Sequence, residues 1–135
     1  PWGRPDMATF IFTKRIIEGK EIEVFNKGKM KRDFTFIDDI VDGIMGAVNL
    51  KIKFEHRIYN LGNNNPEDLS NFINLIEETL AIRAKKKLLP IQPGDVKETF
   101  AEISESTKDL NFMPKVNIEE GIPKFVEWYK TYYKI

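Results

Sequence analysis

The sequence contains no cysteine and a single histidine, His56, among its 135 residues. The lack of cysteine excludes disulfide bonds, thiolate-bound metals and a cysteine nucleophile, and it is typical of proteins in a reducing compartment. One histidine cannot form a zinc site that needs several histidines. No apolar run approaches the roughly 20 residues of a membrane-spanning helix, and the first residues do not resemble a signal peptide. We therefore expect a cytoplasmic protein without a metal site.

Neither sign of charge is in excess, since 21 Lys+Arg stand against 21 Asp+Glu. A general nucleic-acid or membrane-surface binder would carry net positive charge, so we expect neither a nucleic acid nor a membrane as partner. Hydrophobic residues make up 41% of the chain, which is too apolar for a disordered protein. A chain of this length buries about two-thirds of its surface on folding, so we expect one domain over residues 1–135.

Apolar periodicity predicts alternating helices and short strands, and hence an α/β domain. Helices are predicted at about 7–18, 38–48, 66–80, 104–110 and 117–129, and strands at about 21–25, 30–36, 57–61 and 87–91. Asp38 or Asp39 is expected to cap the second helix, and Asn117 with Glu120 predicts a capping box for the last one. Because Pro123 interrupts that last helix, a later start near residue 121 is an alternative. The lysine run 85–87 is interpreted as a solvated connection.

The motifs of a self-sufficient catalytic site are missing from the sequence. It has no glycine-rich phosphate loop, no tyrosine followed four residues later by lysine, and no nucleophile elbow. What remains is chemistry suited to anions. Arg4 lies in a stiff Gly-Arg-Pro loop before a predicted helix, where its planar guanidinium suits a carboxylate or a phosphate. The alternative is a surface arginine in a turn.

Further polar and aromatic residues are candidates for binding a nucleotide. Arg32 follows two nearby lysines, and these cations together could clamp a diphosphate; a solvated strand edge is the alternative. Gly94 and Asp95 end a turn in which the carboxylate could accept hydrogen bonds from two hydroxyl groups, as a ribose offers; a simple turn aspartate is the alternative. Phe25, at a predicted strand end, could stack on a base or belong to the core.

Five blocks of the chain, taken in order and spacing, resemble the C-terminal portion of the extended short-chain dehydrogenase/reductase family. Within it they are most similar to the NAD-dependent nucleotide-sugar epimerases and dehydratases, in particular UDP-glucuronate 4-epimerases of the capsular-polysaccharide type. The resemblance runs over essentially the whole chain. The blocks are Trp2–Ala8, Gly28–Asp39, Tyr59–Asn63, Pro93–Val96 and Gly121–Tyr129.

The resemblance implies the substrate-binding C-terminal part of a Rossmann-type α/β enzyme, without its NAD-binding N-terminal half. In these isomerases NAD removes a hydride from C4 of the sugar and returns it to the other face of a 4-keto intermediate, with a tyrosine as acid and base. This chain has neither the glycine-rich loop nor the Tyr/Lys pair, so we expect no NAD binding and no activity of the chain alone. We expect a piece of a longer or split enzyme, with apolar helix faces covered by the missing half or by a homo-oligomer.

By the same resemblance, several residues are expected to bind a UDP-sugar, UDP-glucuronate or UDP-galacturonate. Arg4 matches the arginine near the sugar carboxylate, and Arg32 matches the arginine that binds the diphosphate. Glu23 and Phe25 match the strand that faces the uracil. Gly94–Asp95 matches the loop whose aspartate holds the ribose hydroxyls.

Two alternatives to this assignment stay open. The chain could come from a related dehydratase or another UDP-sugar epimerase, or it could be a stand-alone sugar-nucleotide-binding or interaction module. UDP-galactose 4-epimerases carry an arginine three residues before the aspartate of the ribose loop, where this sequence has Gln92. The dehydratases of dTDP-glucose differ at Gly3–Met7, which favours the epimerase.

Overall fold

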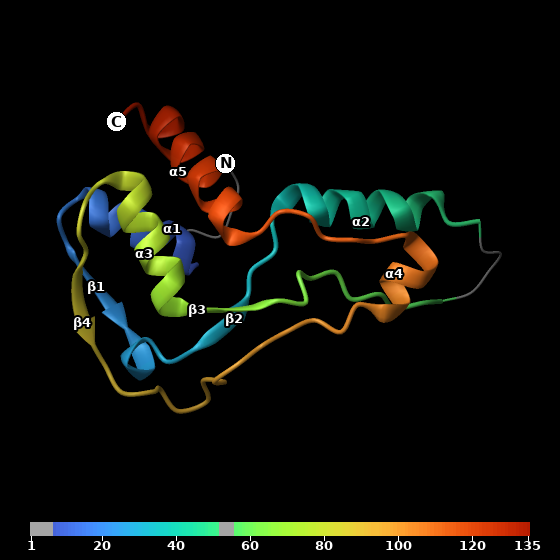
Figure 1. The fold of residues 1–135 in the computed structure, drawn as a ribbon, viewed down its shortest axis with the longest axis horizontal. Coiled ribbons are helices and arrows are strands. Elements are labelled where there is room, and N and C mark those ends of the chain that lie inside the picture. The colour runs from blue at the N-terminus through green and yellow to red at the C-terminus, as the bar shows by residue number, and fades with distance from the viewer. Residues whose placement is uncertain (1–6, 52–55) are drawn as a thin grey trace.

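The computed structural model describes residues 7–51 and 56–135, and it is elongated, with its hydrophobic core at one end (Figure 1). In chain order the elements are α1 (Ala8–Ile17), β1 (Glu21–Val24), the 3-10 turn η1 (Phe25–Gly28), β2 (Lys31–Asp33), α2 (Ile37–Asn49), β3 (Pro66–Asp68), α3 (Leu69–Leu80), β4 (Lys85–Leu88), α4 (Ser104–Leu110) and α5 (Ile118–Tyr133). None of the described helices is both long and apolar enough to cross a membrane.

Two short sheets hold the segments together. β1 pairs in parallel with β4, and β2 pairs antiparallel with β3. Along β1 the side chains alternate between solvent and core, so that Ile22 and Val24 are buried while the glutamates point outward. The interpretation of the lysine run 85–87 as a connection is wrong, because these residues form β4, an edge strand whose four side chains are exposed.

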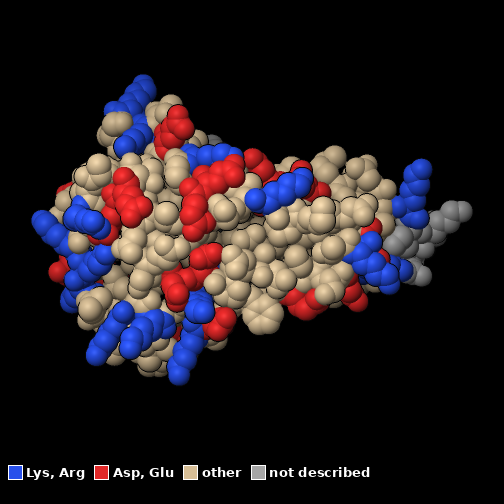
Figure 2. Space-filling model, viewed as in Figure 1, with Lys and Arg blue, Asp and Glu red and all other residues tan. Residues whose placement is uncertain are grey.

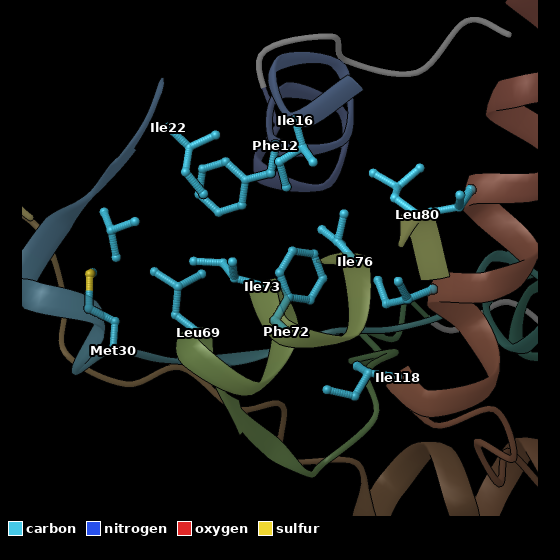
Figure 3. Packing of buried hydrophobic residues seen from close by; sticks show 13 residues of the cluster. Phe12, Ile16, Ile22, Met30, Leu69, Phe72, Ile73, Ile76, Leu80 and Ile118 are labelled. Carbon is cyan, nitrogen blue, oxygen red and sulfur yellow. The ribbon is translucent and has the colours of Figure 1, made fainter. Parts of the chain in front are cut away.

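The core is built where α1, β1, α3 and α5 meet (Figure 3). α3 supplies its centre, and Phe72, which is only 1% exposed, stacks on Phe34 with ring centroids 4.2 Å apart. Apolar residues at helical spacing on α1 and α5 pack against it, as the periodicity predicted. The buried residues contributed by these three helices include Phe12, Ile16, Phe72, Ile73, Ile76, Ile118, Ile122 and Val126.

The capping box predicted for the last helix is confirmed in its Asn117 half, whereas the Glu120 side chain accepts from Lys124. The Asn117 side chain accepts a hydrogen bond from the Glu120 backbone N–H at 3.0 Å, and α5 begins at Ile118. The later start near residue 121 is therefore wrong, and Pro123 lies inside the helix. The missing N–H of this proline leaves one carbonyl of the first turn without its usual donor.

The prediction that Asp38 or Asp39 caps the second helix is wrong. Phe36 is the residue that precedes the helix, and no side chain caps it. Asp39 lies in the first turn, is only 3% exposed, and accepts hydrogen bonds from the backbone N–H groups of Lys115 and Val116 at 3.0 and 3.1 Å. It therefore ties α2 to the segment that leads into α5.

α2 extends away from the core, and one whole apolar side of it faces solvent. The exposed fractions reach 62% for Ile37 and 70% for Val48. The face shown in Figure 2 carries Lys and Arg at the end where β1 and β4 lie, and a large uncharged area over the half that contains α2. The expectation of uncovered apolar helix faces is thus confirmed for α2.

Two strand assignments differ from the prediction. Residues 57–61 form no strand, and within the described ranges no other strand lies beside them to supply the hydrogen bonds that a strand needs. Pro66 does not open a helix; it begins β3, because Pro66, Glu67 and Asp68 pair with the three residues of β2. The helix α3 starts only at Leu69.

Candidate functional site

A cavity of about 330 Å³ opens beside α1, where β1, β2 and the loop after β4 converge. Four of the residues that line it were predicted as binding residues from the sequence: Glu23, Phe25, Arg32 and Asp95. Most of the other lining residues are apolar and come from α1, α3 and the segments around β2: Met7, Ala8, Phe12, Met30, Phe34 and Leu69. The cavity therefore has a charged end and an apolar wall.

The charged end is formed by Arg32 and Asp95. The Arg32 Nη2 atom lies 3.9 Å from Asp95 Oδ1, and the two side chains are 27% and 33% exposed. Arg32 also donates a hydrogen bond from Nη1 to the Lys31 carbonyl at 2.8 Å, which fixes the direction of the guanidinium. At 3.9 Å the ion pair is too long for a hydrogen bond, so both groups keep donors and acceptors for a bound molecule.

Asp95 is presented by a tight turn. Its backbone N–H donates to the Gln92 carbonyl at 3.1 Å, and Gly94 adopts a φ of +87°, a left-handed conformation that favours glycine. Gly94 itself is not among the residues that line the cavity. Its contribution is the shape of the turn that carries the aspartate.

Phe25 stands at the apolar side and opens η1. Asn26, Lys27 and Gly28 all have positive φ, so the chain turns directly behind the ring. Phe25 lines the cavity and also packs against the hydrophobic core, so its contact with the core is confirmed and its stacking on a base stays a prediction. Glu23 is half-exposed, and its Oε1 atom lies 3.9 Å from Lys87 Nζ on β4.

Arg4, the predicted partner of a sugar carboxylate, lies outside the described residues. His56 is exposed and borders none of the cavities described here. The position of Arg4 relative to the cavity therefore stays a prediction.

A second cavity, of about 250 Å³, lies between the start of α5 and the segment before α2. Its walls carry no charged side chain; they are mainly aromatic and aliphatic, including Phe36, Ile122 and Phe125. An uncharged wall cannot neutralise a diphosphate. The cavity at Arg32 is the candidate site because four of the predicted binding residues line it.

Sequence reasoning missed Asp33 as a residue of this region. Its carboxylate accepts hydrogen bonds from the backbone N–H groups of Asn63, Asn64 and Ala101 at 3.0, 3.0 and 2.8 Å. These donors are between 30 and 68 residues away along the chain. No local pattern reveals such partners; the only signal was the position of Asp33 directly after Arg32.

The residues of this chain do not fit a bound NAD. A dinucleotide site needs a glycine-rich loop between a strand and a helix, and the sequence contains none. In the described part, the junction of β3 and α3 runs Asp-Leu-Ser without a glycine, and β2 is joined to α2 by Phe-Thr-Phe. A helix N-terminus alone does not supply the close backbone approach that a pyrophosphate needs.

Comparison with known proteins gives concordant similarities. Residues 1–62 match the NAD dependent epimerase/dehydratase family. An uncharacterized protein of Methanocaldococcus jannaschii is 55% identical over 128 residues, which make up 95% of this chain and 39% of that protein. UDP-glucuronate 4-epimerase 5 of Arabidopsis thaliana is 44% identical over 148 residues, which make up 98% of this chain and 34% of that protein.

The fold gives the same result. The crystal structure of UDP-glucuronic acid 4-epimerase from Bacillus cereus, in complex with UDP-glucuronic acid and NAD, superposes with a TM-score of 0.90 at 31% identity. The superposition covers 98% of this chain and 42% of that chain. These matches confirm the family resemblance, and the chain spans less than half the length of these relatives.

Proposed function

Because this chain has the α/β fold of part of the extended short-chain dehydrogenase/reductase epimerases, we propose that residues 1–135 form the nucleotide-sugar-binding part of a UDP-glucuronate 4-epimerase-like enzyme. The observation that carries this proposal is the convergence of Glu23, Phe25, Arg32 and Asp95, from three separate segments, on one cavity. The structural relative from Bacillus cereus contains UDP-glucuronic acid and NAD, which identifies the ligand class to test.

Each end of the cavity suits one part of such a ligand. Arg32 can donate charge-assisted hydrogen bonds to the diphosphate, whose charge it partly neutralises. Asp95 has acceptor oxygens for the ribose hydroxyls, and the half-buried position of its side chain strengthens those bonds. Glu23 and Phe25 flank the uracil from β1 and η1, and the apolar wall excludes water from the base. A volume of about 330 Å³ lies within the range of small-molecule sites.

In the proposed enzyme, this chain binds and orients the substrate but does not perform the redox step. Epimerisation at C4 through a 4-keto intermediate needs NAD, and the residues of this chain do not fit that cofactor. The hydride chemistry is therefore assigned to residues outside this sequence. Arg4 is proposed to pair with the sugar carboxylate, and the turn at Gly94 to present Asp95 to the ribose.

Titration calorimetry on the 135-residue chain tests the binding role. UDP-glucuronate is expected to bind, and Arg32→Ala to weaken binding about tenfold or more, because a hydrogen bond to a charged group contributes roughly 1.5–3 kcal/mol. Arg83→Ala is the matched control: Arg83 is 82% exposed, pairs with Glu77, and does not line the cavity.

Three results would count against the proposal. The first is no binding of UDP-glucuronate by the wild-type chain, and the second is an equal loss of affinity in Arg32→Ala and Arg83→Ala. The third is equally tight binding of dTDP-glucose, which would favour a related dehydratase as the source of the chain.

A further inference from the structure

Asp33 brings three distant segments of the chain together. It ends β2, directly after Arg32, and uses both carboxylate oxygens: Oδ1 accepts from Asn63 N–H, and Oδ2 accepts from Asn64 and Ala101 N–H. Hydrogen bonds from backbone N–H groups to a carboxylate are charge-assisted and about twice as strong as neutral ones. Both carboxylate oxygens are thus engaged by structural donors.

The packing around this carboxylate is tight enough to require a glycine. A Cβ atom at Gly62 would lie 2.3 Å from the Ala101 Cβ and 3.0 Å from Asp33 Oδ2. No side chain larger than hydrogen fits there without a shift of the backbone. The loop 62–64 and the segment at Ala101 are therefore pressed against the end of β2.

The segment held in this way is the one that carries Asp95. Residues 97–99 run alongside β2: Lys31 N–H donates to the Lys97 carbonyl at 2.9 Å, and Thr99 N–H donates to the Lys31 carbonyl at 3.3 Å. Asp33 fastens the same segment two residues further on, at Ala101. Asp95 stands just before this fastened stretch, beside Arg32 at the charged end of the cavity.

We propose that Asp33 is a positioning residue for nucleotide binding, which holds the 97–101 segment against β2 so that Asp95 faces Arg32. Asp33 and Arg32 are neighbours on one strand, so the same strand sets the phosphate contact and, through the segment, the ribose contact. This inference rests on the proposed function. It predicts that loss of the Asp33 carboxylate weakens recognition of the ribose more than recognition of the diphosphate.

The test compares UDP with 2′-deoxy-UDP in titrations of the 135-residue chain. In the wild type, the 2′-deoxy compound is expected to bind about tenfold more weakly, because it lacks one hydrogen bond to a charged carboxylate. The ratio of the two dissociation constants, that of 2′-deoxy-UDP over that of UDP, is expected to fall toward one in Asp95→Asn. Asp33 lines the same cavity, but its carboxylate is bound by backbone N–H groups. Asp33→Asn is therefore expected to reduce this ratio only through the position of Asp95, and to add nothing when Asp95→Asn is already present.

Asp39→Asn is the matched control, since Asp39 is also a carboxylate that accepts backbone N–H bonds, but from residues 115 and 116. It should lower stability and leave the ratio near its wild-type value. Should Asp33→Asn fail to fold, Gly62→Ala leaves the Asp33 carboxylate unchanged but places a Cβ against Ala101, which pushes the segment at 101 away from β2, and it is expected to lower the ratio in the same way.

The outcomes separate this inference from the proposed function. Binding of UDP with an unchanged ratio in Asp33→Asn or Gly62→Ala overturns the positioning role alone. An equal loss of the ratio in Asp39→Asn also overturns it, because the effect would then be general loosening. A wild-type chain that binds neither UDP nor UDP-glucuronate overturns both.

Discussion

Replacement of Asp39 by asparagine is expected to destabilise the fold by roughly 2–4 kcal/mol. The side chain is 3% exposed, and each of its oxygens accepts one backbone N–H bond from the segment before α5. An asparagine keeps one acceptor but turns an NH2 group toward the second N–H. The loss of one charge-assisted bond, together with the buried donor that it leaves unpaired, costs about 2–4 kcal/mol.

Asp38→Asn is the control that makes this prediction sharp. Asp38 is the adjacent residue in the same helical turn, yet it is exposed. Its replacement should change the free energy of unfolding only through the helix dipole, by less than about 1 kcal/mol.

Thermal and urea unfolding followed by circular dichroism measure both variants. At about 3–4 °C per kcal/mol for a chain of this size, Asp39→Asn should lower the melting temperature by roughly 6–16 °C. Equal melting temperatures for the two variants would refute the reasoning. They would show that Asp38 and Asp39 contribute equally, as a cap at either position would imply.

Two further predictions concern the core and the pH dependence of stability. Phe72→Ala should destabilise the fold by about 3–5 kcal/mol in urea unfolding, because Phe72 is 1% exposed and stacks on Phe34; a loss below about 1 kcal/mol would contradict this packing. Although burial opposes the shift, hydrogen bonds from Ala84 N–H and Lys86 lower the pKa of the buried Glu77 carboxyl. Because the pKa of Glu77 is lower in the folded than in the unfolded chain, its ionised carboxylate stabilises the fold. This stabilisation is complete at a pH above the pKa of unfolded glutamate, near 4.3, and it is lost as the pH falls through the lower pKa of the folded chain. We therefore expect the difference in the free energy of unfolding between wild type and Glu77→Gln to decrease as the pH is lowered below about 4.3. A difference that does not change with pH would show that Glu77 does not titrate in this way.

The parts of the fold that depend on near neighbours in the chain could be predicted from the sequence. Helical stripes of apolar residues predicted α1, α2, α3 and α5, and the N-cap at Asn117 was predicted from residues three apart. β3 was missed because its strand character comes from pairing with β2, more than 30 residues earlier. The roles of Asp33 and Asp39 were missed for the same reason, since their donors lie far along the chain.

The candidate site was predicted for a different reason. Local patterns left Arg32, Asp95 and Phe25 with plain structural alternatives, and only the family resemblance placed them in one site. The structure brings these three and Glu23 around one cavity, while Arg4 lies outside the described residues. The sequence could not predict the hydrogen bonds that hold the site, because backbone N–H donors are present in almost every residue type and cannot be recognised from the sequence.

The lysines of β4 have a consequence for how copies of this chain can associate. The outer rim of the β1–β4 sheet is a row of exposed residues that includes Lys85, Lys86 and Lys87. Lys86 is held by Glu77, but Lys85 and Lys87 remain exposed, and exposed lysines on an edge strand discourage its pairing with the edge strand of a second copy. If copies of the chain associate at high concentration, this edge strand therefore disfavours growth of a continuous sheet. The exposed apolar side of α2 offers a contact that one partner molecule can cover.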